Sequence, residues 1–186
     1  IDFSARSLAY AREQASNAKL RIAYVEADYL AYETDRRFDL ILMIMCDFCA
    51  LSPDRRAVLL RKFRSMLSGT GAILLDVYAP AILDAREEGV TYARDLLDGF
   101  WSPDEYFGFL HTIKYDDRRL LLDKYTIVER DRTRHIFNWL QCFTPSELEE
   151  EFADCGLEVV ERRGDVAGGA YDLGAPEFAV VARSID

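Results

Sequence analysis

The stretch Phe38-Asp39-Leu40-Ile41-Leu42-Met43-Ile44-Met45 decides the fold of this 186-residue chain. It is nearly continuously apolar, which is typical of a parallel strand that helices cover on both faces. Ser52 as N-cap and Pro53 at the first helical position then begin a helix, and a second apolar strand follows over residues 72–78. A strand, a helix and a strand joined by short connections predict a right-handed βαβ unit.

Local patterns predict the elements on both sides of this unit. Apolar residues at three- and four-residue spacing predict a helix over 5–18 capped by Ser4, and alternation predicts a short strand over 20–25. Mixed aromatic, β-branched and charged residues predict antiparallel strands between 106 and 143. Thr144 and Glu147 form a capping box, with Pro145 at the first helical position and Gly156 at the end of that helix. Two final strands, 157–161 and 178–182, are expected to close the chain as an antiparallel hairpin.

Composition limits the function. The formal charge is −10 and the pI is near 4.8, which argues against a nucleic-acid partner because phosphate backbones are bound by clustered Lys and Arg. No run of about 18 apolar residues predicts a membrane span, and four irregularly spaced cysteines indicate reduced thiols. We therefore expect a cytoplasmic protein with a single domain over residues 1–186, into which residues 100–143 are inserted.

Two acids follow the predicted strand ends. Asp2 stands directly before the first helix, and Asp28 follows the strand at 20–25. In doubly wound folds an acid in this position hydrogen-bonds ribose hydroxyls, because ligands sit at the carboxyl ends of strands. The alternative for Asp2 is an acid favoured by the helix dipole, and the alternative for Asp28 is a turn residue.

Together with Phe38-Asp39 and the segment Leu67-Ser68-Gly69-Thr70-Gly71, these acids resemble the motifs of class I S-adenosylmethionine-dependent methyltransferases acting on small molecules. The resemblance covers essentially the whole chain. It implies an α/β fold: a Rossmann-like methyltransferase sheet, with the first strand and most of the second absent, an antiparallel terminal hairpin and an inserted antiparallel β segment. It also implies S-adenosyl-L-methionine as cofactor. The implied cofactor-binding residues are Asp2 with Phe3 and Ser4 for the ribose, Asp28 with Tyr29 for the adenine, and Met45 and Cys46 on the methionine side.

Two departures from the family pattern stand out. The family's Leu-x-Pro-Gly-Gly turn keeps only its last glycine here, at Gly71. Nothing matches the first strand with its glycine-rich loop, so we expect a preceding segment to belong to the working protein. Without it, the chain would expose apolar sheet edges, through which a homo-oligomer could form.

The sequence Cys46-Asp47-Phe48-Cys49 is a C-x-x-C motif. It has no second pair at metal-site spacing, so we expect no metal site. The competing interpretations are buried thiols beside the cofactor and a turn at the mouth of the methyl-transfer pocket, with Asp47 and Phe48 near the substrate.

Aromatic residues dominate the inserted segment. They either close the core or form a lid over the substrate, with Trp101, Tyr106 and Trp139 facing it. A general base is needed only for a protonated acceptor, and the candidates are Asp47, Tyr78 and His111. His111 could equally be a half-buried structural residue.

The sequence thus favours methyl transfer from S-adenosylmethionine to a small molecule by in-line displacement. One alternative is a non-catalytic methyltransferase-like protein that pairs with another chain. Another is a nucleotide-cofactor oxidoreductase, against which the terminal hairpin argues.

Overall fold

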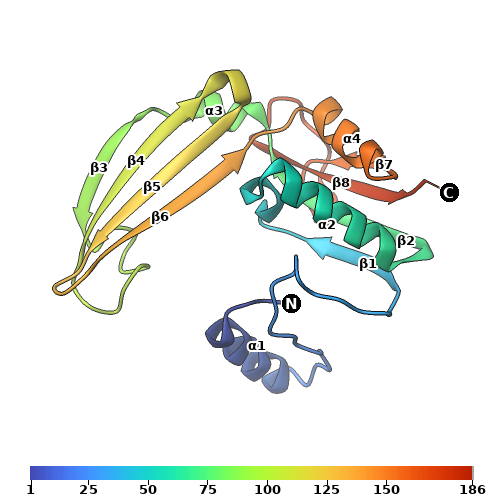
Figure 1. Cartoon of the computed structure of the whole chain (residues 1–186), viewed down its shortest axis with the longest axis horizontal. Coiled ribbons are helices and arrows are strands. Elements are labelled where there is room, and N and C mark those ends of the chain that lie inside the picture. The colour runs from blue at the N-terminus through green and yellow to red at the C-terminus, as the bar shows by residue number, and fades with distance from the viewer. Residues whose placement is uncertain (186) are drawn as a thin grey trace.

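The computed structural model describes residues 1–185 of the chain and contains two four-stranded sheets (Figure 1). The first sheet has the strand order β1-β2-β8-β7, and the second has the order β3-β4-β5-β6. Helix α1 (Ala5–Asn17) lies apart from both sheets near the N-terminus. As predicted, the hydroxyl of Ser4 caps α1 by accepting a hydrogen bond from the amide of Ser7.

The predicted βαβ unit is confirmed. Strand β1 (Phe38–Met43) pairs in parallel with β2 (Leu67–Tyr78), and α2 (Pro53–Met66) connects them. A short 3-10 helix, η1 (Asp47–Ala50), lies between β1 and α2.

The segment 67–71 does not form the separate turn that the resemblance implied, because β2 starts at Leu67 immediately after α2. The pairing of β1 with β2 shifts register between Phe38 and Leu40. At this irregularity, a Cβ on Gly71 would lie 2.6 Å from the carbonyl oxygen of Phe38. The glycine therefore allows the two backbones to approach each other closely.

The terminal hairpin is also confirmed. Helix α4 (Pro145–Asp154) begins with the predicted capping box, and β7 (Leu157–Arg163) follows it. Strand β8 (Glu177–Ser184) then runs antiparallel between β2 and β7. This reversed last strand, together with the parallel β1–β2 pair, is the predicted Rossmann-like methyltransferase sheet.

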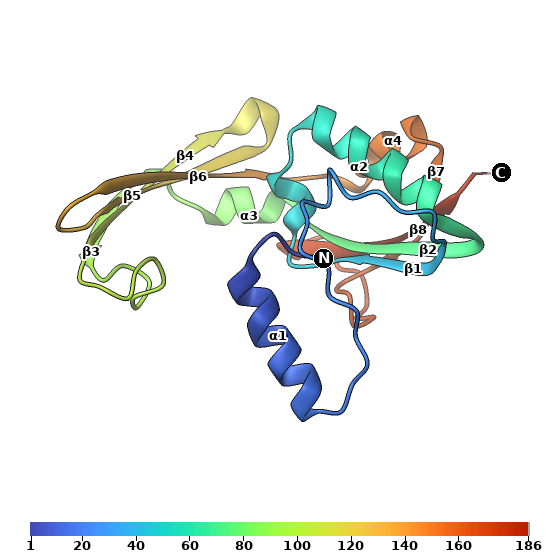
Figure 2. The same ribbon diagram turned by 60° about the horizontal axis from the view of Figure 1, so that its bottom comes forward.

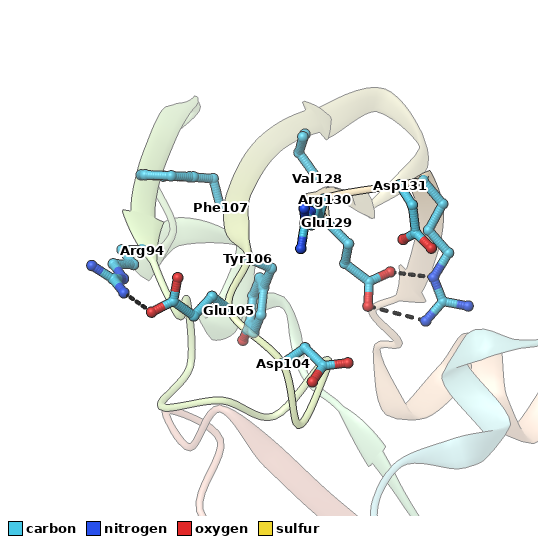
Figure 3. Close-up of a pocket in the computed structure, with 10 residues that line it drawn as sticks. Arg94, Asp104, Glu105, Tyr106, Phe107, Val128, Glu129, Arg130 and Asp131 are labelled. Carbon is cyan, nitrogen blue, oxygen red and sulfur yellow. Dashed lines mark hydrogen bonds and ion pairs between the residues drawn. The ribbon is translucent and has the colours of Figure 1, made fainter.

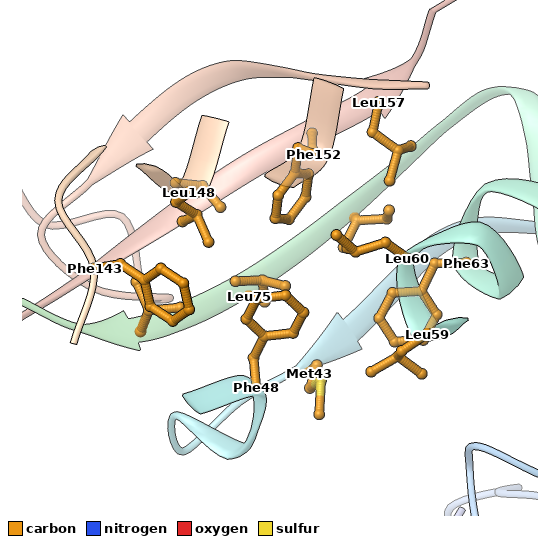
Figure 4. Close-up of a cluster of buried hydrophobic side chains, with 14 of the residues drawn as sticks. Met43, Phe48, Leu59, Leu60, Phe63, Leu75, Phe143, Leu148, Phe152 and Leu157 are labelled. Atoms are coloured by element: carbon orange, nitrogen blue, oxygen red, sulfur yellow. The ribbon is translucent and has the colours of Figure 1, made fainter. Parts of the chain in front are cut away.

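Helices α2 and α4 cover one face of the first sheet and enclose the main core (Figure 4). The core side chains of the strands come from alternate positions of β2, such as Ile73 and Leu75, which are fully buried. Phe48 from η1 and Phe152 from α4 pack ring against ring beneath them, with centroids 6.1 Å apart. The core thus fixes η1 directly beside the carboxyl ends of β1 and β2.

The opposite face of β1 differs from the prediction. We expected helices on both faces, but the side chains of Leu40 and Leu42 are 52% and 57% exposed. The predicted strand at 20–25 is also wrong, since this segment makes only an isolated parallel bridge between Glu26 and Asp2. An alternating pattern becomes a strand only where a neighbouring strand satisfies its backbone, and no strand of residues 1–185 runs beside it.

The inserted segment forms an antiparallel meander that projects away from the first sheet (Figure 1). It contains the strands β4 (Phe107–Tyr115), β5 (Leu120–Val128) and β6 (Thr133–Gln141), and β3 (Gly89–Arg94), which precedes residue 100, adds the fourth strand of the sheet. The 3-10 helix η2 (Asp116–Arg118) connects β4 with β5. Strand β3 was missed by the sequence analysis, and it lies on the outer edge of the sheet.

One face of this second sheet is covered. Helix α3 (Pro80–Ala85) packs there, with Leu83 against Leu121 and Leu140. The loop between β3 and β4 also packs on this face, where the ring of Trp101 lies against that of Tyr125 with centroids 4.8 Å apart. Figure 2 shows that α3 and this loop lie on the same side of the sheet as the N-terminus.

Candidate functional site

The candidate site lies where β1, β2 and the segments around Asp2 and Glu26 end. The amide of Asp2 donates to the carbonyl of Val25 at 3.1 Å, and the amide of Ala27 donates to the carbonyl of Asp2 at 3.0 Å. These two bonds hold the segments side by side and parallel. They bring Asp2 close to Asp28, which follows Glu26 by two residues, although neither segment forms a regular strand.

Both acids are held in defined turns. Oδ1 of Asp2 accepts the amide of Ser4 at 2.7 Å, and Oδ1 of Asp28 accepts the amide of Leu30 at 2.8 Å. Each turn uses one carboxylate oxygen, which leaves the other for a ligand. Beside them, burial raises the pKa of Tyr29, and the carboxylates of Asp47 and Asp28 raise it further.

The chain turns sharply after β1. Met45 and Cys46 both have positive φ, at 69° and 56°, a conformation that is strained for residues with side chains. The carboxylate of Asp76 holds this turn, because Oδ1 accepts the amide of Cys46 at 2.9 Å and Oδ2 accepts that of Met45 at 3.2 Å. The Met45 side chain is consequently 81% exposed, whereas Cys46 is buried.

Carboxylates gather around this turn. Burial raises the pKa of Asp47, and the nearby carboxylates of Asp76 and Asp2 raise it further. Glu177, at the start of β8, lies opposite Tyr78 in the β2–β8 pairing and accepts from the Cys46 thiol at 3.9 Å. The site therefore combines several negative groups in a partly buried position, which favours a cationic ligand.

The thiols of the C-x-x-C motif are free and buried. A hydrogen bond with Cys49 is the main cause that raises the pKa of the Cys46 thiol, and burial adds to it. The sulfur of Cys49 accepts the amide of Tyr78 at 3.2 Å. Since the nucleophile and metal ligand is the thiolate, this environment fits packing beside the site better than redox or metal chemistry.

Burial also raises the pKa of Tyr78, as do the neighbouring Cys46, Cys49 and Glu177. The backbone of Tyr78 forms a bridge with Cys142 and so joins the two sheets at this point. Because its pKa is raised, the hydroxyl of Tyr78 keeps its proton at neutral pH and does not act as a base.

Several other predicted site residues lie elsewhere. Phe48 is fully buried between Phe143 and Phe152 in the main core, not in contact with a substrate cavity. Tyr106 is also buried, and its hydroxyl donates to the carbonyl of Leu96. Phe48 therefore packs within the core, whereas Tyr106, although buried, lines a cavity at the far end of the second sheet.

His111 and Trp139 both point to the uncovered face of the second sheet. Strand pairing places His111 in the same row as Val90 and Lys124, on the side opposite to Trp101 and α3. Trp101 and Trp139, which the sequence suggested as two anchors of one lid, consequently lie on opposite faces. Of the two, Trp101 lies on the side of the sheet that faces the N-terminus.

A cavity of about 1040 Å³ lies at the end of the second sheet that is far from the candidate site at β1 and β2 (Figure 3). Charged side chains line it, and most of them pair with one another. Arg94 pairs with Glu105, whereas Glu129 accepts from Arg132 and from Arg134. Hydrogen bonds from Arg132 and Ser102 lower the pKa of Glu129 to about 2. Because these charged groups already pair with one another, fewer of them are free to bind a ligand than at the carboxyl ends of β1 and β2.

Asp76 and Glu177 are the site residues that the sequence analysis missed. Asp76 is an acid near the carboxyl end of a strand that is otherwise apolar, and that isolated position was a usable signal. Glu177 offered no such signal, because its place beside Tyr78 depends on the insertion of β8 next to β2.

Comparison with known proteins supports this fold assignment. Residues 1–71 match the family model of a methyltransferase domain. The methyltransferase CcbJ from Streptomyces caelestis has a similar structure, with a TM-score of 0.70 and 20% identity over 96% of this chain and 71% of that chain. An S-adenosylmethionine-dependent methyltransferase from Clostridium acetobutylicum ATCC 824 gives a TM-score of 0.72 and 13% identity, covering 98% of this chain and 72% of that one.

A third similar structure is the glycopeptide N-methyltransferase MtfA complexed with S-adenosyl-L-methionine. Its TM-score is 0.55 and its identity 18%, over 98% of this chain and 75% of that chain. Among curated proteins, none matches in sequence. Within residues 1–185, no helix is long and apolar enough to cross a membrane. The chain therefore has the fold of the class I S-adenosylmethionine-dependent methyltransferases, and its first 71 residues match the model of a methyltransferase domain.

Proposed function

We propose that this chain binds S-adenosylmethionine and transfers its methyl group to a small-molecule acceptor by in-line displacement. The observation that carries the proposal is the parallel bridge between Asp2 and Glu26, which brings Asp2 close to Asp28, two residues after Glu26. In doubly wound folds, such acids contact the nucleoside part of a ligand. The match of residues 1–71 to a methyltransferase domain covers this same region.

The residues present fit the cofactor. The second carboxylate oxygen of Asp2, with Phe3 and Ser4 beside it, would accept from the ribose hydroxyls. Asp28 and Tyr29 would hold the adenine. The turn at Met45 and Cys46 would line the methionine portion, near the carboxylates that surround Asp47.

When bound, the cofactor supplies a methyl group on a positively charged sulfur, which needs no further activation. The protein then has to hold the acceptor atom in line with that methyl group, and such positioning accounts for much of the rate enhancement in reactions of this kind. The carboxylates around Asp47 would attract the sulfonium, and the positive-φ turn at Met45 and Cys46 would present a fixed backbone to the methionine portion.

We infer that the acceptor is an amine. The negative groups Asp47 and Glu177 would attract a protonated amine, and Asp47 can take the proton that an ammonium must lose before it attacks. Two of the solved structures with this fold are named as N-methyltransferases of a sugar and of a glycopeptide. His111 is not suited to this role, because it lies on the far face of the second sheet.

Replacing Asp47 by Asn removes both the negative charge and the proton acceptor at this position. The folded state raises the pKa of Asp47 above its ordinary value of 3.8, so the ionised carboxylate destabilises the fold at higher pH. Asp47→Asn is therefore expected to raise the melting temperature at pH 7, and this gain should vanish as the pH falls below 3.8. Methylation of an amino sugar should slow by about 100-fold, the usual contribution of a general base.

The measurement pairs melting curves across pH with initial rates for an amino sugar and for the same sugar carrying a hydroxyl in place of the amine. Faster methylation of the hydroxyl compound would contradict the amine proposal. An unchanged rate for the Asn variant would remove Asp47 from the proton transfer.

Cofactor binding itself is tested at Asp2. A hydrogen bond to a charged group contributes about 1.5–3 kcal/mol, so Asp2→Asn should weaken the binding of S-adenosylhomocysteine by roughly 10- to 100-fold. Asp117→Asn is the matched control, because Asp117 is an exposed acid on η2 at the second sheet. Isothermal titration measures both variants, in this chain and in a version extended upstream of Ile1.

If neither this chain nor the extended version binds S-adenosylhomocysteine when unmutated, the methyltransferase proposal is overturned. That result would favour the alternative, a non-catalytic protein with this fold that pairs with another chain. The exposed side chains of Leu40 and Leu42 on β1 are the observation that supports that alternative.

A further inference from the structure

The uncovered face of the second sheet is aromatic. Strand pairing assigns to it the even-numbered positions of β3 and β5 and the odd-numbered positions of β4 and β6. We call this surface the aromatic face. Its largest exposed side chains are Tyr92, Phe107, Phe109, Val128, Phe137 and Trp139.

These side chains are exposed to an unusual degree for apolar groups. Their exposed fractions run from 37% for Val128 to 73% for Tyr92. Tyr92 stacks on Phe109 with ring centroids 5.9 Å apart, and Tyr115 packs at the same distance from Trp139. These two ring pairs join β3 with β4 and β4 with β6, so part of the aromatic surface is grouped across the strands.

The aromatic face also differs in charge from the rest of the chain. The chain contains 33 Asp and Glu residues and carries a net charge of −10, yet none of the side chains at the positions that define this face is Asp or Glu. The cation Lys124 lies over the ring of Phe137, at 5.8 Å from its centroid. Two copies of so acidic a chain repel each other least where both surfaces lack carboxylates.

The size of the face suits a second copy. Three strands of nine residues and one of six, about 4.8 Å apart and with about 3.4 Å per residue, give a footprint of roughly 540 Å². Two such faces would bury about 1,080 Å² in total, just above the roughly 1,000 Å² that a specific interface should exceed.

We propose that two copies of this chain pack their aromatic faces together, sheet on sheet, about a two-fold axis. Sheets that pack face to face lie about 10 Å apart with interdigitating side chains. A two-fold axis brings the same patch to both sides, so the partner surface has the required size, apolar character and lack of carboxylates. This dimer is independent of the methyl-transfer proposal, and it differs from pairing through the sheet edges.

The test is the oligomeric state of the full chain, measured by sedimentation velocity from about 1 µM to about 100 µM. We expect a species of twice 21.3 kDa. Phe137→Glu places a carboxylate on the face at a side chain that is 54% exposed, so the folded monomer should tolerate it. The dimer dissociation constant is expected to rise by at least about 100-fold, and Tyr92→Glu on another strand should act in the same direction.

Two matched controls distinguish this interface from others. Leu40→Glu alters a similarly exposed side chain on β1, and Leu173→Glu alters a loop side chain that is 80% exposed. Both should leave the dimer intact, and circular dichroism should show all four variants folded. A monomeric wild-type chain would overturn the proposal. So would a dimer that survives Phe137→Glu, or one that Leu40→Glu dissociates while Phe137→Glu does not.

Discussion

Asp76→Ala is expected to reduce cofactor affinity by more than about 100-fold while the main core stays folded. Both carboxylate oxygens of Asp76 are used by the amides of Met45 and Cys46. Without them, two backbone donors in a strained turn lose their partners, and each unsatisfied donor costs about 1–3 kcal/mol. The turn should relax to an ordinary conformation, and the backbone proposed to line the methionine portion would move with it.

The measurement is the dissociation constant of S-adenosylhomocysteine by titration calorimetry, with circular dichroism to monitor folding. Asp76→Asn is the matched variant, because its amide keeps one acceptor oxygen for one of the two backbone amides. We expect an intermediate affinity for it. Equal affinities of the Ala variant and the unchanged chain would show that Asp76 does not position the turn for the cofactor.

Local chemistry made part of the fold predictable. The capping box at Thr144 and Glu147 depends on residues three apart, and the structure contains both of its hydrogen bonds. The βαβ unit followed from long apolar runs and from the helix start at Ser52 and Pro53. These signals survive because the interactions they require lie within one element or between neighbouring elements.

The predictions that were wrong concern features that depend on contacts between distant parts of the chain. Strand β3 has every residue exposed, so its sequence carries no alternation of buried and exposed positions to detect. The segment 20–25 does alternate, but alternation alone does not supply a pairing strand. Which face of the second sheet would be covered depended on α3 and the loop around Trp101, which no local pattern specifies.

In the candidate site, too, some residues could be inferred from their own segment and others depended on distant contacts. Asp2 and Asp28 could be proposed from the sequence because ligands bind at the carboxyl ends of parallel strands, and their role in cofactor binding stays a prediction. Phe48 lies only two residues beyond Cys46, but contacts with Phe143 and Phe152 draw its ring into the core. Those partners lie about a hundred residues further along the sequence, so the direction of this side chain could not be inferred from its own segment.

Removing the buried guanidinium of Arg56 should have the largest effect on stability. Arg56 is 3% exposed and forms two parallel bonds with Glu151 of α4, Nε to Oε2 at 2.7 Å and Nη2 to Oε1 at 2.6 Å. Its third nitrogen donates to the carbonyl of Leu51 at 2.6 Å, and its plane lies 5.0 Å from the centre of the Phe143 ring. One side chain thus links α2, η1 and α4 over the core.

Breaking a buried pair by removing one partner typically costs about 3–5 kcal/mol, which is a large share of the roughly 5–15 kcal/mol that stabilises a domain. Arg56→Ala is therefore expected to lower the melting temperature by roughly 10 °C. Arg162→Ala is the matched control, because Arg162 pairs with Glu149 on the same helix but is 44% exposed. An exposed pair contributes at most about 1 kcal/mol, so this variant should melt within a few degrees of the unchanged chain.

A double variant, Arg56→Met with Glu151→Leu, tests whether the ion pair stabilises the fold more than two apolar side chains would, or whether only the loss of one partner is destabilising. Apolar replacements of similar volume leave no buried charge without a partner, and in other proteins such replacements have been neutral or stabilising. We expect the double variant to melt above Arg56→Ala, because Met refills the space of the guanidinium and the half-buried carboxylate of Glu151, 30% exposed, is removed together with its partner. If the double variant is as unstable as Arg56→Ala, the contacts of the guanidinium with Leu51 and Phe143 hold η1 in place, and the carboxylate is secondary. In that case the turn at Met45 and Cys46, which enters η1, should also lose order, and cofactor affinity should fall together with the melting temperature.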